Sequence, residues 1–207
     1  MMLLQVIYLV AITAEAASGA IMGMRRRMDV FGICVVGTVT ALGGGSIRDM
    51  LLGHYPLGWV AHPEYLFFTV GAALSAAFLV RFMHRVRMAF LLLDALGLVA
   101  FAVIGCDIAA AAGVHPAIVV LMGMVTGICG GLLRDVLCNQ VPLVLRRDLY
   151  ASVALATGTL YVLLQRYGAS HEHATAIALV AGFLFRLASI KWGLALPVFT
   201  TRRRLDD

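Results

Sequence analysis

Two arginine–aspartate pairs are the residues whose types and spacing could do chemistry in this chain. Arg48-Asp49 follows three glycines, Arg134-Asp135 closely follows two, and both pairs lie in long apolar runs. Charges in such runs often mark an ion or substrate path, and carbonyls freed by glycines can coordinate a cation. We find no catalytic pattern, and the weak metal-like pattern His171-Glu172-His173 is interpreted as a solvated turn. We therefore predict passage of a positive ion, and neither an enzyme nor a metal site.

The two motifs are copies of one another. Segments 37–49 and 123–135 lie 86 residues apart, and they are identical at seven of their thirteen positions. The same offset pairs Gly19 with Gly105, and no gap is needed. In membrane proteins, a doubled apolar run broken by glycines is a pointer to a duplicated fold with discontinuous helices.

The composition is that of an integral membrane protein. Of the 207 residues, 62% are hydrophobic and 13% are charged, whereas about a quarter of the residues in a soluble domain are charged. The net charge is +5, but the basic residues sit between apolar runs and form no stripe with interleaved aromatics. We therefore expect membrane lipids as partners and no nucleic acid.

The apolar segments predict an all-α membrane protein with a single membrane domain over residues 1–207. A span needs about 20 residues, and seven segments cross or nearly cross. They are 2–24, 30–52, 65–82, 88–110, 116–137, 149–164 and 174–192. The first three form one repeat (2–82), the next three a second (88–164), and the seventh helix (174–192) is additional. Because three spans is an odd number, the two repeats must insert in opposite directions.

Basic residues predict the orientation. They follow every second span, where cytoplasmic loops would lie, and this places the N-terminus outside and the C-terminus in the cytoplasm. The clusters are Arg25, Arg26 and Arg27; Arg81, Arg85 and Arg87; Arg146 and Arg147; and Lys191, Arg202, Arg203 and Arg204.

The glycine clusters predict breaks in two spans. Asp29 is a suitable N-cap for the span at 30–52. Each glycine costs about 1 kcal/mol relative to alanine in a helix, so we expect a kink or an unwound turn at both clusters, with a half-helix resuming at Ser46. The clusters are Gly43, Gly44 and Gly45, and Gly130 and Gly131. Freed backbone groups cannot face lipid, so they would line water. Close helix packing is the alternative role of these glycines.

The buried charges have two interpretations as well. Arg48 and Asp49 are expected near the outer mouth of a path, and Arg134 and Asp135 near the inner mouth. They either form structural salt bridges that stabilise a gate or contact the ion directly. Glu15 lies ~15 Å deep and Asp94 ~10 Å from the cytoplasmic side. A protonated side chain bonded to a neighbouring helix is the structural alternative for Glu15. Arg186 is expected to reach the interface.

The motifs resemble those of two related families. The resemblance rests on residues 43–49, their echo at 130–135, and the Asp94-Ala95-Leu96-Gly97 start of the fourth span. It covers about residues 4–195. One family is the prokaryotic branch of the trimeric intracellular cation (TRIC) channels. The other is the bacterial glycine-transporter-domain family of inner-membrane proteins.

The resemblance implies a bacterial inner-membrane homotrimer with a pore for monovalent cations, chiefly potassium, in each protomer. The pore is constricted where the second and fifth helices kink. The polar positions beside the kinks are Thr40, Ser46 and Thr126. No cofactor is implied beyond permeant potassium or sodium ions, with bound lipid as a further candidate. A secondary transporter of glycine or another small amino acid is the alternative function, since inverted repeats with broken helices also occur in transporters.

Overall fold

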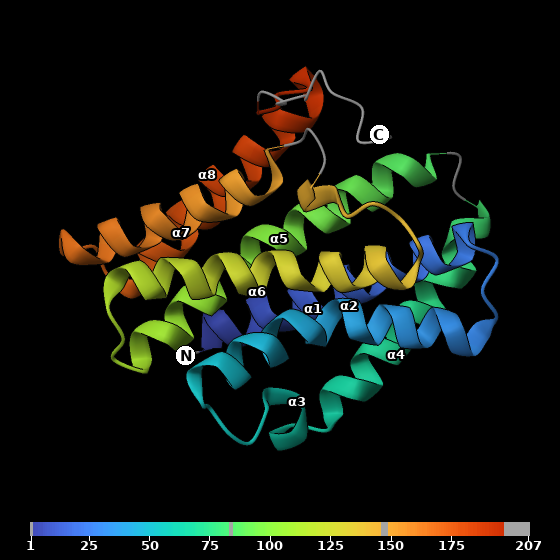
Figure 1. The fold of residues 1–207 in the computed structure, drawn as a ribbon, viewed down its shortest axis with the longest axis horizontal. Helices are drawn as coiled ribbons and strands as arrows, with labels where there is room; N and C mark the ends of the chain where they lie inside the picture. Colours follow the sequence, from blue (N-terminus) through green and yellow to red (C-terminus); the bar gives the residue numbers. More distant parts are fainter. Residues whose placement is uncertain (1, 83–84, 146–148, 197–207) are drawn as a thin grey trace, which may run out of the picture.

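The computed structural model describes residues 2–82, 85–145 and 149–196 and consists of helices (Figure 1). In chain order the helices are α1 (Met2–Arg25), α2 (Val30–Leu52), α3 (Gly58–Ala61), α4 (Glu64–Leu79), η1 (Val80–Phe82), α5 (Val86–Ala111), α6 (Pro116–Leu137), η2 (Leu143–Leu145), α7 (Tyr150–Arg166) and α8 (His171–Trp192).

Five of these helices are long and apolar enough to cross a membrane: α1, α2, α5, α6 and α8. The other two expected spans form shorter helices, because α4 has 16 residues and α7 has 17. At 1.5 Å per residue, α4 is ~24 Å long, which is less than a typical hydrocarbon core of ~30 Å. All seven expected segments are therefore helical, but only five have the full length.

Local signals set the helix ends. The Asp29 side chain accepts a hydrogen bond of 2.8 Å from the Gly32 backbone N–H, as expected of an N-cap. Ser170 caps α8 in the same way. Gly53 ends α2 and Gly193 ends α8, both in the left-handed conformation that glycine adopts without strain.

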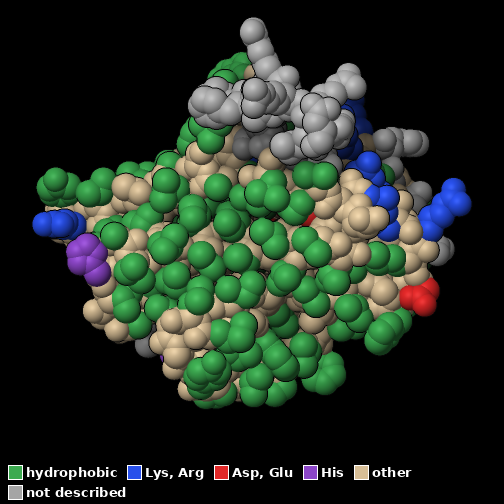
Figure 2. Space-filling model, viewed as in Figure 1, with side chains coloured by type: hydrophobic (Ala, Val, Ile, Leu, Met, Phe, Trp, Pro, Cys, Tyr) green, Lys and Arg blue, Asp and Glu red, His purple; other side chains and the backbone are tan. Residues whose placement is uncertain are grey.

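The helices form a bundle with α1, α2, α5 and α6 at its centre. α4 flanks α1 and α2, and α7 flanks α5 and α6, so the two sets of three pack in the same way. α8 lies against α7 and α5 (Figure 1). The visible face in Figure 2 is largely hydrophobic between its ends, and the lysine and arginine side chains lie near its margins. This distribution suits a bundle surrounded by lipid.

The two sets of helices are related by reciprocal contacts. A Cβ atom at Gly37 of α2 would lie 2.9 Å from the Ala16 carbonyl oxygen of α1. At positions 86 residues further on, a Cβ atom at Gly123 of α6 would lie 2.6 Å from the Ala102 carbonyl oxygen of α5. The duplication seen in the sequence is therefore a duplication of helix packing, in which small residues let backbones approach closely.

The two repeats meet where α2 crosses α6. A Cβ atom at Gly44 would collide with the Thr126 carbonyl oxygen, and one at Gly130 would collide with the Thr40 carbonyl oxygen. The two contacts are equivalent, because Gly44 and Gly130 are 86 positions apart and so are Thr40 and Thr126. The pairs also run in opposite order, so α2 and α6 are antiparallel at a two-fold axis.

The predicted unwound turns are wrong. α2 is helical through Gly43, Gly44 and Gly45, and α6 is helical through Gly130 and Gly131, so no half-helix begins at Ser46. The space that side chains would need at Gly44 and Gly130 is occupied by the backbone of the opposite helix. Glycine is therefore required at these two positions for close approach in this conformation, and the helical hydrogen bonds need not break.

The orientation prediction relied in part on residues outside the described ones. Arg146, Arg147, Arg202, Arg203 and Arg204 lie there, and nothing in the structure tests the orientation.

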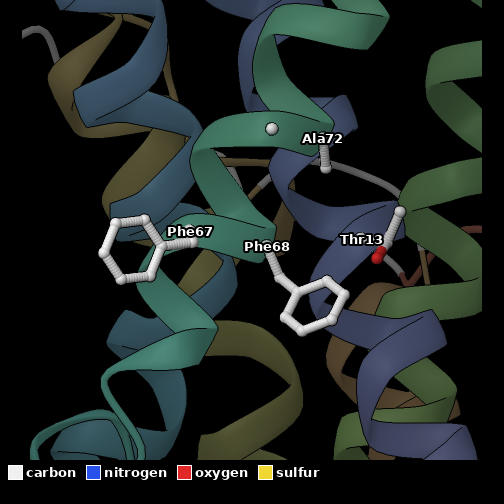
Figure 3. Close-up of a pocket in the computed structure, with 5 residues that line it drawn as sticks. Thr13, Phe67, Phe68 and Ala72 are labelled. Carbon is white, nitrogen blue, oxygen red and sulfur yellow. The ribbon is translucent and has the colours of Figure 1, made fainter.

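An apolar groove of about 360 Å³ lies between α1 and α4 (Figure 3). Phe67 and Phe68 line it and are exposed, and its single hydroxyl, on Thr13, bonds to the Leu9 carbonyl oxygen. Such a surface suits lipid chains and not ions.

The crossing predicts a position-specific effect of adding one methyl group. Gly44→Ala should destabilise the protein by about 1–3 kcal/mol, because the new methyl group must push α6 away from α2. Gly71→Ala on α4 is the matched control, since no atom lies within 4 Å of its added Cβ, and it should leave stability equal or slightly higher. Thermal unfolding of both purified variants in detergent checks this, and equal midpoints would contradict the crossing.

Candidate functional site

The inner Arg-Asp pair lies in a buried polar cluster built by four helices. Arg134 of α6 has no exposed surface, and its Nη1 donates to Asp94 Oδ1 of α5 at 2.7 Å and to Ser18 Oγ of α1 at 3.2 Å. Its Nε donates to Asp135 Oδ1 at 2.9 Å. Tyr150 of α7 donates its hydroxyl to the same Asp94 oxygen at 3.1 Å. We call these residues, together with Glu15, the inner cluster.

Glu15 completes the inner cluster from α1. It is 1% exposed, and its Oε2 accepts a hydrogen bond of 3.0 Å from Ser18 Oγ. Its other oxygen, Oε1, has no hydrogen-bond partner among the described residues, and neither does Asp94 Oδ2. Glu15 and Asp94 were both predicted as intramembrane charges, and the structure places them around one arginine. A buried carboxylate oxygen without a partner is costly and calls for an explanation.

Arg186 of α8 is not at the interface, so the expectation that it snorkels is wrong. It is fully buried, and its guanidinium lies over the Tyr150 ring at 4.7 Å from the centroid. Its three nitrogens have no hydrogen-bond partner among the described residues. An aromatic face attracts a cation, and this ring connects Arg186 to the inner cluster. The sequence carried no signal for this pairing, because α7 and α8 meet only in the fold.

The outer Arg-Asp pair lies at the other end of the bundle. Arg48 donates to Asp49 Oδ1 from Nε at 2.9 Å and from Nη2 at 2.7 Å. The second oxygen of Asp49 accepts from the Gly58 backbone N–H at 3.2 Å. The inner pair has the same device, because Asp135 Oδ2 accepts from the Leu143 backbone N–H at 2.8 Å. Each aspartate therefore ties its helix end to the loop that follows it.

The two halves differ in the charges around these pairs. The position equivalent to Asp94, 86 residues earlier, is Tyr8, and the position equivalent to Glu15, 86 residues later, is Phe101. The outer arginine therefore has one carboxylate partner, whereas the inner arginine has two and a third nearby. The fold is duplicated, but the inner arginine is surrounded by more carboxylates than the outer one.

A cavity opens next to each Arg-Asp pair. The inner cavity has a volume of about 510 Å³ and is lined by Met22, Arg25, Arg26, Arg87, Phe90, Leu91, Gln140 and Leu143. The outer cavity has a volume of about 220 Å³ and is lined by Leu4, Gln5, Tyr8, Arg48, Asp49, His54, Gly58, His62, Tyr65, Ile104, Asp107 and Ile108.

The two cavities occupy equivalent places in the two repeats. Gln5 and Leu91 are 86 positions apart, as are Met22 and Ile108, and His54 and Gln140. The inner cavity stops at Phe90, whose ring lies 4.7 Å from the guanidinium carbon of Arg134. Phe90 therefore separates the basic cavity from the inner cluster.

The crossing of α2 and α6 is closed. The Thr40 hydroxyl donates to the Val36 carbonyl oxygen and the Thr126 hydroxyl to the Met122 carbonyl oxygen, both at 2.6 Å. Both threonines are buried, and their hydroxyls bond within their own helices. Ser46 likewise donates to the Leu42 carbonyl oxygen at 2.8 Å, and it accepts from the Trp59 indole N–H at 3.1 Å.

The remaining predicted glycines contact different groups. A Cβ atom at Gly43 would meet the Leu133 side chain, and one at Gly45 would lie 3.6 Å from Arg48 Nη2. A Cβ atom at Gly131 would lie 2.8 Å from the Tyr150 hydroxyl, inside the inner cluster. The predicted site residues thus form two charged ends and a central crossing, and not one compact site.

Comparisons with known proteins agree with this architecture. The profile of the family described as Glycine transporter matches twice, at residues 5–81 and 91–166, which correspond to the two repeats. The inner membrane protein YadS of Escherichia coli K12 is 40% identical over 186 residues, covering 89% of this chain and 90% of that protein.

Solved channel structures share the fold. The TRIC trimeric intracellular cation channel orthologue from Rhodobacter sphaeroides has a TM-score of 0.90 and 36% identity, covering 94% of this chain and 100% of that one. A prokaryotic TRIC channel crystallised in 0.5 M KCl has a TM-score of 0.87 and 33% identity, covering 94% and 99%.

The inner cluster predicts unequal roles for the two arginines. Arg134→Met should destabilise the protein by about 3–5 kcal/mol, because it leaves Asp94 and Asp135 buried without their cation. Arg48→Met should cost clearly less, because it leaves one buried carboxylate, Asp49, without its cation instead of two. Unfolding by sodium dodecyl sulfate in mixed micelles, followed by circular dichroism, compares the two. Equal losses would contradict the difference in the number of carboxylates that each arginine pairs with.

Proposed function

This chain belongs to the membrane-protein family described as Glycine transporter and has the fold of prokaryotic TRIC cation channels, and on that premise we propose that it conducts monovalent cations. Potassium is the ion we propose, with a path through each protomer. The observation that carries the proposal is the pair of equivalent cavities, one ending at Arg48 and Asp49 and the other at Phe90 beside Arg134, with the α2–α6 crossing between them. This is the arrangement expected of a path closed at its centre.

We propose that the path opens by bending of α2 and α6 at their glycines. Gly43, Gly44 and Gly45, with Gly130 and Gly131, would then form the constriction. Moving Gly44 away from the Thr126 carbonyl would expose that oxygen to the path, and the reciprocal movement of Gly130 would expose the Thr40 carbonyl. Carbonyl oxygens that face water can replace part of the hydration shell of a potassium ion. The hydroxyls of Thr40, Ser46 and Thr126 would add further oxygen ligands beside them.

The charged ends have a gating role in this proposal. Arg48 is neutralised by Asp49, and Arg134 by Asp94 and Asp135. These ion pairs fix the arginine side chains, so a passing cation does not meet a mobile positive charge at either mouth. Glu15 adds a further ionisable carboxylate at the inner end, whereas its equivalent at the outer end, Phe101, adds none.

Assembly and location follow from the relatives. One solved relative is described as trimeric, and we propose that this chain also forms a homotrimer. The curated relative is an inner membrane protein, and we propose the same membrane here, with the N-terminus outside. Arg25 at the end of α1 and Arg87 at the start of α5 line one cavity, which supports a common cytoplasmic side. Lipid chains would contact the apolar groove between α1 and α4 (Figure 3).

Transport of glycine is a second candidate, and one observation favours it beyond the family description. The inner cluster holds unpartnered carboxylate oxygens on Glu15 and Asp94 and an unpartnered nitrogen, Nη2, on Arg134. A zwitterionic amino acid needs these two kinds of partner, one for its ammonium and one for its carboxylate. The channel is preferred because the two equivalent cavities open at opposite ends of the bundle, as a path through the protein requires.

Flux through liposomes distinguishes the two functions. Purified protein is reconstituted, and efflux of potassium and sodium is measured alongside uptake of labelled glycine. A channel gives cation flux that does not saturate at millimolar concentration and needs no amino acid, with single-channel steps in planar bilayers. Saturable glycine uptake without such steps would establish the transporter instead.

Phe90 offers a specific test of the path. Phe90→Ala should raise cation flux severalfold, because it removes the ring that separates the inner cavity from Arg134. Leu91→Ala is the matched control, because Leu91 lines the same cavity. The ring that lies against the Arg134 guanidinium belongs to Phe90 and not to Leu91. Unchanged flux in Phe90→Ala, with wild-type stability and assembly, would exclude a path past this residue.

A further inference from the structure

The inner cluster contains more carboxylates than its cations neutralise. Helix α1 contributes Glu15, α5 contributes Asp94 and α6 contributes Asp135, whereas the cations are Arg134 of α6 and, beside the cluster over the Tyr150 ring, Arg186 of α8. All five side chains are at most 2% exposed. If every group were ionised, three negative charges would face two positive ones. An uncompensated charge without water is unfavourable enough that a group neutralises instead.

The hydrogen bonds locate the surplus charge. Asp135 uses both of its oxygens, on Arg134 and on the Leu143 backbone N–H. Asp94 uses only Oδ1, and Glu15 uses only Oε2. The two carboxylate oxygens without a partner therefore belong to Glu15 of the first repeat and Asp94 of the second, and neither acid has an acidic counterpart in the other repeat. Tyr150 faces them from α7 with a neutral hydroxyl, while the charged residues Arg48, Asp49 and Glu64 of α2 and α4 form other contacts.

We propose that Glu15 and Asp94 together bind one exchangeable proton, which makes the inner cluster a proton-binding site. The proton supplies the missing positive charge. It also turns one of the two unpartnered carboxylate oxygens into a hydrogen-bond donor. Helices α1 and α5 thus contribute one acid each to a single site beside Arg134.

Packing favours a proton over a metal cation at this site. A Cβ atom at Gly97 would collide with the Glu15 carboxylate, and the space at Gly131 is taken by Tyr150, Arg134 and Asp94. The inner cavity borders the cluster at Phe90, and no residue of the cluster lines it. A potassium ion needs several oxygen ligands at once, whereas a proton needs no additional volume.

The site gives the proposed channel a sensitivity to pH from one side, and this consequence rests on the proposed function. The inner cavity reaches Phe90, directly over Arg134, whereas the outer half has Tyr8 and Phe101 at the equivalent positions. Loss of the proton adds a negative charge beside Arg134 and strengthens its hold on α1 and α5. Alkaline pH on the inner side should therefore stabilise the closed crossing and lower the flux.

Infrared spectroscopy of the full-length protein in lipid tests the site without any flux measurement. At neutral pH the wild type should show the C=O stretch of one protonated carboxylic acid, shifted in deuterated water. Glu15→Gln and Asp94→Asn should each remove that band, because the remaining acid can then ionise against Arg134. Glu172→Gln, which alters an exposed carboxylate on α8, is the matched control and should leave the band unchanged.

The outcomes separate the two proposals. A wild type without any protonated carboxyl band at neutral pH overturns the proton site, whether or not the variants fold. A band that persists in folded Glu15→Gln and Asp94→Asn overturns it as well. A band that disappears in both variants supports the site even if the liposomes carry no cation flux, which would contradict only the channel.

Discussion

The absence of water in the bilayer core is the constraint on which this structure depends. Every polar group placed there must find its partner within the protein, because lipid offers none. The helices satisfy this for their backbones. The side chains satisfy it through compact arrangements such as Arg134, which binds residues of α1, α5 and α6 at once. The few atoms that remain unpaired therefore mark the places where something else must bind or move.

Duplication explains how one short sequence element can serve two ends of a bundle. Each Gly-Gly-x-x-Arg-Asp element provides a small surface for helix crossing and, one turn later, an ion pair that holds the next loop. Because the copies are antiparallel, the crossings meet at the centre and the ion pairs lie at opposite ends. Divergence then separates the two ends: Tyr8 and Phe101 stand near the outer arginine, where Asp94 and Glu15 stand near the inner one.

Much of this arrangement could be predicted from the sequence, and the failures have a physical cause. The offset of 86 residues, the apolar runs and the N-cap at Asp29 are local signals, and the structure and the two profile matches agree with them. Whether glycines break a helix or admit a neighbour depends on what lies opposite, and the sequence does not reveal that Gly44 faces the Thr126 carbonyl. For the same reason the partners of Arg186 and Glu15 could not be predicted, since Tyr150 and Ser18 become neighbours only through tertiary packing. The cavities could not be predicted either, because each is lined by residues from several helices.

The reciprocal contact at the crossing limits how such a chain can evolve. Gly44 touches backbone and not a side chain, so no substitution at position 126 can make room for a larger residue at position 44. The same holds for Gly130 and position 40. The glycines at the two-fold axis therefore cannot be replaced by larger residues in either copy. Residues away from the axis, such as Tyr8 and Asp94, can differ between the copies. Asymmetric function in a molecule of this kind must therefore arise at its periphery, around a centre that stays symmetric.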